Sequence, residues 1–206
     1  MKQNSVTKKK PKLKPEAKQK LNAAIKKLFS AKPYSEVGMR DLAKTAGISV
    51  DTIYRHYESK EKLLVTFLVD EWLSDLRLRV TDHLKGIDSA EEKLRKISWL
   101  LHEYVEKNPE IGKIIFFALP NEFFFKSYYY LPLVQDYFML YVELVKEGQD
   151  KGILNPDMTP GHLLEHLSNT LKVSFGRWVA GREKKPPTEL AKLDFDIFWN
   201  GVRKSA

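Results

Sequence analysis

Residues 38–64 read GMRDLAKTAGISVDTIYRHYESKEKLL, and this stretch decides the fold. Its first apolar residues share one face of a short helix; they are Met39, Leu42, Ala43 and Ala46. Gly47 supplies the backbone freedom of a tight turn, and Ser49 is a suitable N-terminal cap for a second short helix. Two short helices joined by a turn that contains glycine form a helix-turn-helix. The sequence therefore predicts this motif over residues 38–57.

The helical pattern continues on both sides of the motif. From residue 15 onward, apolar residues recur at the spacing of one helix face; they are Leu21, Ala24, Ile25, Leu28 and Phe29. Ser59 is placed to cap a long helix that reaches about Lys85. A further helix is expected to begin at the capping box Ser89-Ala-Glu-Glu92, and others over residues 109–119, 127–151, 159–181 and 188–205. No alternating pattern typical of strands competes with them. The expected fold class is all-α.

The positive charge lies at the N-terminal end of the chain. The 206 residues carry a net charge of +8, with +10 on residues 1–62 and −2 on residues 63–206. This concentration favours a phosphate-bearing partner for the helix-turn-helix. The lysine-rich tail, residues 1–14, is expected to be disordered in isolation. It is either an arm that contacts the DNA backbone or minor groove, which we favour, or a solubilising tail.

Several classes of function are disfavoured by what the sequence lacks. It contains no cysteine, and the longest apolar run is Ile114 to Leu119, so we expect a soluble, cytoplasmic protein. Serine nucleophile elbows, glycine-rich phosphate loops and dinucleotide fingerprints are missing, so neither an enzyme nor a cofactor is expected. The segment His162-Leu-Leu-Glu165-His166 matches a short zinc-peptidase pattern and leaves zinc hydrolysis as a remote alternative. Solvated histidines explain it more simply, and no metal site is expected.

The second helix of the motif carries groups that can hold DNA. Thr52, Tyr54, Arg55 and His56 offer hydrogen-bond donors within five residues, and Lys60 begins the next helix. A solvated helical hairpin is the simpler interpretation. The motif and its surroundings closely resemble the DNA-binding domain of TetR-family transcriptional regulators, over about residues 15–75. The resemblance lies in the order of Tyr34 and the runs Arg40-Asp-Leu-Ala, Ala46-Gly-Ile-Ser, Thr52-Ile-Tyr and Ser59-Lys-Glu.

The resemblance implies a DNA-contacting role for residues of the motif. The implied positions are Arg40, Ser49, Val50, Asp51, Thr52, Tyr54, His56 and Lys60. Val50 offers only apolar contact, such as to a thymine methyl group. Asp51 accepts from a cytosine amine or, as we favour, acts only at the helix N-terminus.

Residues 76–206 are expected to form a helical effector-binding and dimerisation domain, as the resemblance implies. Thirteen of the 24 aromatic residues lie between Trp99 and Tyr141; they form either core or an apolar cavity. Candidate lining residues are Trp72, Trp99, His102, Phe116, Tyr137, Tyr141 and Phe175. The last two helices carry apolar stripes that serve either as dimer interface or as intrachain core. Candidate interface residues are Leu163, Leu167, Leu171, Trp178, Leu193, Ile197 and Val202.

The expected function is that of a homodimeric repressor, released from a palindromic operator by a small apolar or aromatic effector. Dimerisation follows from reading a two-fold DNA site. A DNA-bound protein that recruits a protein partner without a small ligand is the alternative.

Overall fold

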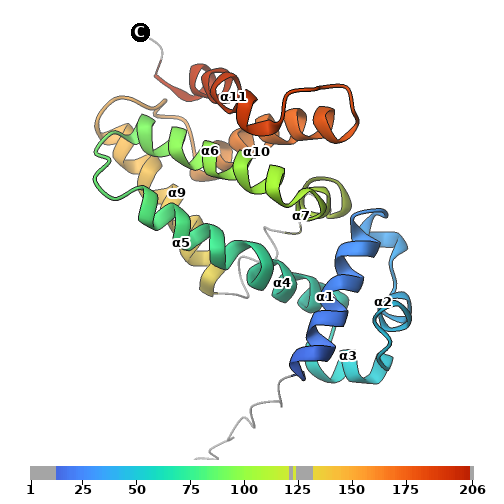
Figure 1. The fold of residues 1–206 in the computed structure, drawn as a ribbon. Coiled ribbons are helices and arrows are strands. Elements are labelled where there is room, and N and C mark those ends of the chain that lie inside the picture. Colours follow the sequence, from blue (N-terminus) through green and yellow to red (C-terminus); the bar gives the residue numbers. More distant parts are fainter. Residues whose placement is uncertain (1–12, 121–122, 124–131, 205–206) are drawn as a thin grey trace, which may run out of the picture.

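The computed structural model describes residues 13–120, 123 and 132–204, and helices dominate this part of the chain (Figure 1). Its only bridge between extended residues joins Leu154 to Arg203. None of the described helices is long and apolar enough to cross a lipid bilayer. The all-α prediction is confirmed.

The first four helices form a small bundle, which we call the head (residues 13–68). It comprises α1 (Pro15–Phe29), α2 (Met39–Ala46), α3 (Val50–Tyr57) and α4 (Lys60–Leu68), with the short turn η1 (Tyr34–Glu36) before α2. Leu21, Ile25, Leu42, Ile53 and Leu64 are fully buried among them. These are the apolar positions of the sequence pattern, so burial of one face per helix explains why the segments fold together.

Local hydrogen bonds explain the sharp corners of the helix-turn-helix. Gly47 ends α2 with φ 66°, in the left-handed region that a glycine adopts without strain. The Oγ atom of Ser49 accepts a hydrogen bond from the Thr52 amide (3.1 Å) and caps α3, as predicted. At the start of α2, the Gly38 amide donates to the Asp41 carboxylate (2.8 Å). The motif predicted for residues 38–57 is present.

The head continues directly into the rest of the chain through one long helical segment. A π-helical turn, η2 (Val69–Leu73), joins α4 to α5 (Ser74–His83), and we call this turn the joint. The segment ends close to the predicted Lys85. Because a π-helical turn changes the hydrogen-bond register, it interrupts the regular ladder between two rigid helices.

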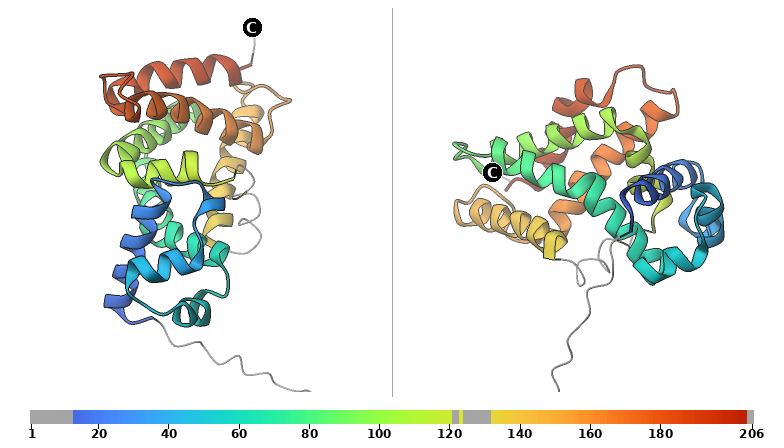
Figure 2. Two further views of the ribbon diagram at one scale, coloured as in Figure 1. Left: turned by 90° about the vertical axis from the view of Figure 1, so that its right-hand side faces the viewer. Right: turned by 60° about the horizontal axis from the view of Figure 1, so that its bottom comes forward.

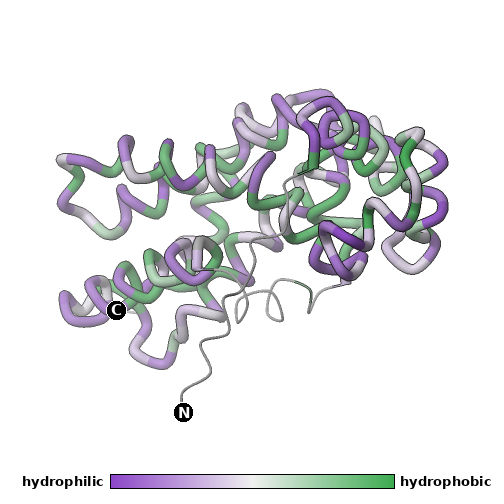
Figure 3. Tube along the Cα trace, turned by 90° about the horizontal axis from the view of Figure 1, so that it is seen from below, coloured by the Kyte–Doolittle hydropathy of each residue, from purple (hydrophilic) through white to green (hydrophobic). Residues whose placement is uncertain are grey.

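The remaining helices form the body (described residues from 74 to 204). They are α5, α6 (Ala90–Lys107), α7 (Pro109–Lys113), the π-helical turn η3 (Ile114–Ala118), α9 (Pro132–Asp150), α10 (Pro160–Val179) and α11 (Pro187–Val202). Two views show the head at one end of the molecule, while α10 and α11 lie at the opposite side of the body (Figures 1 and 2). In Figure 3, hydrophobic and hydrophilic stretches alternate along the helices, as amphipathic helices require.

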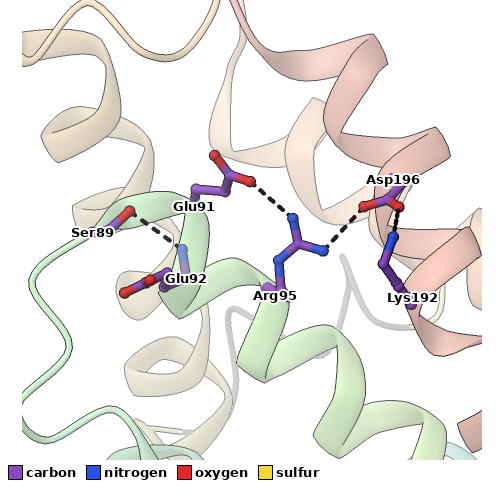
Figure 4. Close-up of polar contacts among 6 residues, drawn as sticks. All are labelled: Ser89, Glu91, Glu92, Arg95, Lys192 and Asp196. Atoms are coloured by element: carbon purple, nitrogen blue, oxygen red, sulfur yellow. Dashed lines mark hydrogen bonds and ion pairs between the residues drawn. The ribbon is translucent and has the colours of Figure 1, made fainter.

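Helix α11 is held against α6 by polar and aromatic contacts. Arg95 of α6 donates to Glu91 (2.9 Å) and to Asp196 of α11 (3.0 Å), and Lys192 donates to the other Asp196 oxygen (Figure 4). The Arg95 guanidinium also lies 4.3 Å from the centre of the Phe195 ring. These contacts fix the position of α11, and the other side of this helix remains available to solvent.

Candidate nucleic-acid interface

Helix α3 presents a row of polar side chains to solvent. Tyr54 is 47% exposed, Asp51 and Arg55 are exposed, and Thr52 and His56 are half-buried. Arg40 is also exposed, in the first turn of α2. Ile53 is fully buried, so it anchors the helix while the other side chains face outward. This geometry can place hydroxyl and guanidinium donors against a DNA groove.

Two predicted contact residues have additional partners within the chain. The Thr52 hydroxyl lies 2.7 Å from the Ser49 hydroxyl, which orders both groups at the N-terminus of α3. The Lys60 ammonium donates to the carbonyl oxygens of Tyr34 (2.7 Å) and Val37 (2.9 Å) and lies over the Tyr34 ring. Burial lowers the pKa of Lys60. One of its three N–H donors remains for a phosphate, and the lysine also ties α4 to the start of the motif.

Ion pairs divide the cations of the head into two groups. Four lysines contact carboxylates, in the pairs Lys18–Asp70 (2.7 Å), Lys20–Glu16 (2.7 Å), Lys26–Glu71 (2.6 Å) and Lys62–Glu58. The others have no carboxylate within ion-pair distance among the described residues; they are Lys14, Lys27, Lys32, Arg40, Lys44, Arg55 and Lys60. The second group is the uncompensated charge that DNA phosphates can neutralise. The tail prediction concerns mainly residues 1–12, which lie outside the described residues.

The joint contacts both the head and the body, which the sequence did not reveal. The Glu71 carboxylate accepts from Asn22 (2.8 Å) and Lys26 (2.6 Å) of α1. The Glu71 carbonyl accepts from the hydroxyl of Tyr104 in α6 (2.6 Å). Tyr104 is 4% exposed, and its burial raises the pKa of its hydroxyl. These partners are 33 to 49 residues apart in sequence, so no short-range pattern could predict them.

The residues predicted to line an effector cavity occupy different environments. Trp99 needs correction, since it is 38% exposed and lies beside Lys96 on the outside of α6. His102 is buried, but one ring nitrogen faces the Ser98 carbonyl (2.7 Å) and the other the Asp194 carboxylate (2.9 Å). The first contact lies within α6, and the second joins α6 to α11, so both ring nitrogens already have partners inside the chain.

The other predicted lining residues pack against one another. The rings of Phe116 and Phe175 are 5.8 Å apart, and the hydroxyls of Tyr137 and Tyr141 are 2.8 Å apart. Burial raises the pKa of Tyr137 to about 12. Trp72 lies half-buried in the joint. Most of the aromatic run 123–130 lies outside the described residues. A cavity formed by these side chains remains a prediction.

The predicted dimer residues fall into two sets. Leu163, Leu167, Leu171 and Val202 need correction, because they are at most 2% exposed inside the chain's own core and offer no surface to a partner. Leu193 and Ile197 are 58% and 59% exposed on α11, and Trp178 is half-buried. Val173 (63% exposed) and Phe117 (47% exposed) were not predicted as surface residues, because nothing in the neighbouring sequence distinguishes them from buried apolar residues.

A groove of about 500 Å³ runs along the outer side of α10. Phe117, Val173 and Gly176 are among its apolar lining residues, and Lys172, Arg177 and Arg182 supply positive charge. The Phe117 ring lies close to Gly176, where a β-carbon would approach it to 3.1 Å. Gly176 thus leaves room for the ring to rest against α10.

The zinc-peptidase pattern is not completed in the described part of the chain. His162 and His166 are exposed on α10, and the Nδ1 atom of His162 accepts from the Thr159 amide (3.5 Å). No group of three or more potential metal-binding side chains occurs among the described residues. His162 takes part in the capping box with Thr159 at the start of α10.

Comparison with known proteins identifies the domain in the head. Residues 21–66 match the model of the family described as "Bacterial regulatory proteins, tetR family". The chain is 25% identical over 142 residues to the HTH-type transcriptional regulator UidR of Escherichia coli (strain K12), which covers 67% of this chain and 68% of UidR.

Solved structures share the fold of the whole chain. The fatty acid degradation regulator FadR of Bacillus halodurans superimposes with a TM-score of 0.68 and 20% identity, covering 95% of this chain and all of FadR. FadR of Bacillus subtilis, solved in complex with stearoyl-CoA, gives a TM-score of 0.69 with 16% identity over 90% of this chain and 99% of that protein. The likeness therefore extends beyond the head to the body.

Proposed function

We propose that this chain, a TetR-family transcriptional regulator, is a cytoplasmic, homodimeric repressor that leaves its operator when a small apolar or aromatic effector binds. The observation that carries the proposal is the exposed polar face of α3, held by the buried Ile53 and flanked by uncompensated cations. Such a face can read base edges while its flanks bind phosphates.

Base reading is assigned to Arg40 and the residues of α3. A guanidinium at the start of α2 suits guanine, and the Thr52 and Tyr54 hydroxyls can donate to bases or phosphates. Val50 adds apolar contact. The Lys60 ammonium offers a phosphate its third donor while its other two hold carbonyl oxygens. We assign Asp51 to the N-terminus of α3, where a carboxylate is favoured by the helix dipole.

Dimerisation is assigned to the outer sides of α10 and α11. Val173, Leu193, Ile197 and Phe117 are exposed apolar side chains, and exposed apolar surface of this kind favours a protein partner. The groove along α10 belongs to the same assignment, because a second copy would cover it. Two heads held by one interface can read two half-sites about one helical turn, ~34 Å, apart.

Effector binding is assigned to the aromatic part of the body. Its support is the density of aromatic residues around Phe116, Tyr137 and Phe175, together with the bound stearoyl-CoA of the Bacillus subtilis relative. An effector can release DNA only if it binds one separation of the two heads better than another. The joint is the covalent and hydrogen-bonded route by which a change in the body reaches α1.

Selection of bound duplexes from a random pool tests the DNA-binding proposal. We expect enrichment of a palindrome, and fluorescence anisotropy should show that Arg40→Ala weakens its binding by roughly 5- to 150-fold, because a base contact is worth about 1–3 kcal/mol. Lys146→Gln, an exposed change in the body, is the control and should not alter affinity. Failure of the wild-type protein to enrich any sequence would refute the proposal.

A thermal-shift screen with aromatic, apolar and acyl compounds tests the effector. A compound that stabilises the protein should also release the operator at the same concentration. Stabilisation without release would separate ligand binding from regulation. If no compound stabilised the protein and a defined protein partner were captured, the alternative function would be favoured, in which the DNA-bound protein recruits a partner without a small ligand.

A further inference from the structure

A second groove, of about 490 Å³, lies between α1 and the end of α2. Lysines from both helices meet there, with small residues between them; its lining includes Lys20, Ala23, Lys27, Lys44, Thr45 and Gly47. Except for its buried base, this lining is exposed to solvent. A β-carbon at Gly47 would meet no atom within 4 Å, so the groove is open at the helix-turn-helix turn.

The groove carries uncompensated positive charge. Lys20 contacts the carboxylate of Glu16 (2.7 Å), but Lys27 and Lys44 have no carboxylate within ion-pair distance in the described part of the chain. Like charges on facing helices repel each other unless an anion lies between them. The hydroxyl of Thr45 adds a neutral donor beside the lysines. A concave, cationic site with such donors suits a phosphate group.

Its position links the groove to the surface that reads DNA. Lys44 follows Arg40 by four residues on α2, so the two cations share one helix face. Gly47 directly precedes the turn that leads through Ser49 into α3. The groove therefore reaches the turn that precedes α3.

We propose that this groove binds a backbone phosphate of the operator, outside the base pairs that α3 contacts. Lys27 and Lys44 donate to its oxygens from opposite sides, and Thr45 provides a further donor. The proposal rests on the proposed function, because it assigns a phosphate contact of the same DNA complex. Such a contact raises affinity for any duplex equally and carries no information about sequence.

The test uses the full-length protein, the selected operator and a trimmed duplex that lacks the flanking base pairs. Lys27→Gln/Lys44→Gln should weaken binding to the full operator by about tenfold. It should also make the plot of log affinity against log salt less steep by about 0.9, the contribution of the one phosphate that the groove holds. Trimming should weaken the wild-type protein but hardly affect the double variant. Lys146→Gln/Lys185→Gln removes two exposed positive charges from the body and is the matched control.

Substitutions at Ala23 separate the groove from the lysines themselves. Ala23 is exposed on α1, so Ala23→Glu and Ala23→Lys introduce opposite charges without disturbing the core. We expect Ala23→Glu to weaken binding and Ala23→Lys to preserve or strengthen it. Equal salt slopes for Lys27→Gln/Lys44→Gln and its control, or equal losses on trimming, would overturn the proposal. A different result would refute the DNA-binding proposal itself, because the wild-type protein would then select no operator.

Discussion

The head and the body place their functional residues in opposite ways. In the head, the residues predicted to contact DNA lie within about twenty positions of one another, and all of them are exposed or half-buried around a small core. In the body, most residues predicted for effector or partner binding are buried in contacts between helices that are distant in sequence. A short motif can specify an exposed reading surface, whereas the surfaces of the body depend on which faces its helices bury against each other.

The largest expected effect would show that reading by the head depends on the body. Leu193→Glu/Ile197→Glu places two charges on the outer face of α11 while leaving the head unchanged. We expect the proposed dimer to dissociate and operator affinity to fall by about 10²- to 10⁴-fold, because the second head would no longer bind at high effective concentration. Sedimentation and anisotropy measure the two effects.

Leu78→Glu is the matched control for this substitution. Leu78 is 68% exposed on α5, so the same change of chemistry occurs on another surface of the body. It should leave both the dimer and operator affinity unchanged. A dimeric Leu193→Glu/Ile197→Glu protein would remove α11 from the interface.

A second prediction distinguishes His102 from Trp99, which the sequence placed together as candidate lining residues of the effector cavity. Asp194→Ala leaves the buried His102 without its carboxylate hydrogen-bond partner, and a buried polar group that loses its partner costs about 1–3 kcal/mol. Asp194→Asn should cost less, because an amide retains a hydrogen bond to the imidazole. Trp99→Ala should have a small effect, because Trp99 lies on the surface. Urea denaturation provides the free energies, and similar losses for Asp194→Ala and Trp99→Ala would contradict this distinction.

The motif of the head was predictable because its signals are local. Gly47 and Ser49 act on their immediate neighbours, and the structure places them as the turn and the cap. The apolar stripe of α10 carried less information, since Leu163 and Leu167 have the same pattern whether they face their own chain or a partner. Their burial is decided by α6, α9 and α11, which pack around α10. The joint gave no signal at all, because Glu71 meets Asn22 and Tyr104 only after the chain has folded.

A third prediction concerns the joint, where the two regions meet. Tyr104→Phe removes the hydroxyl that donates to the Glu71 carbonyl and should lower the free energy of unfolding by about 1 kcal/mol. Hydrogen exchange should increase in η2 and α1, and remain unchanged in α10 and α11. Tyr137→Phe deletes a buried hydroxyl that bonds to Tyr141 within α9, so its effect should be confined to the body. If Tyr137→Phe also increased hydrogen exchange in α1, the effect on α1 could not be assigned to the hydrogen bond between Tyr104 and Glu71.

The smallest expected effect compares an ion pair of the body with one of the head. Lys151 and Lys93 hold the pKa of Glu147 below its ordinary value, and Lys20 does the same for the fully exposed Glu16. A carboxyl whose pKa is lower in the folded state contributes stability above its unfolded pKa of about 4.5, and this contribution disappears as the pH falls through the folded value. Glu147→Gln should therefore destabilise the protein by at most about 1 kcal/mol near pH 7, because the lysines remain partly solvated.

The difference between wild type and Glu147→Gln should vanish in acid, where the protonated glutamate and the glutamine carry the same charge. Glu16→Gln should leave the unfolding free energy unchanged within error across this range, because water screens a pair on the outside of α1. Urea denaturation at pH values from 3 to 7, spaced by about one pH unit, gives the unfolding free energy of both variants as a function of pH. A pH-independent loss for Glu147→Gln would assign its role to packing between α6 and α9. An acid-sensitive loss for Glu16→Gln would show that charge stabilises the head as much as the body.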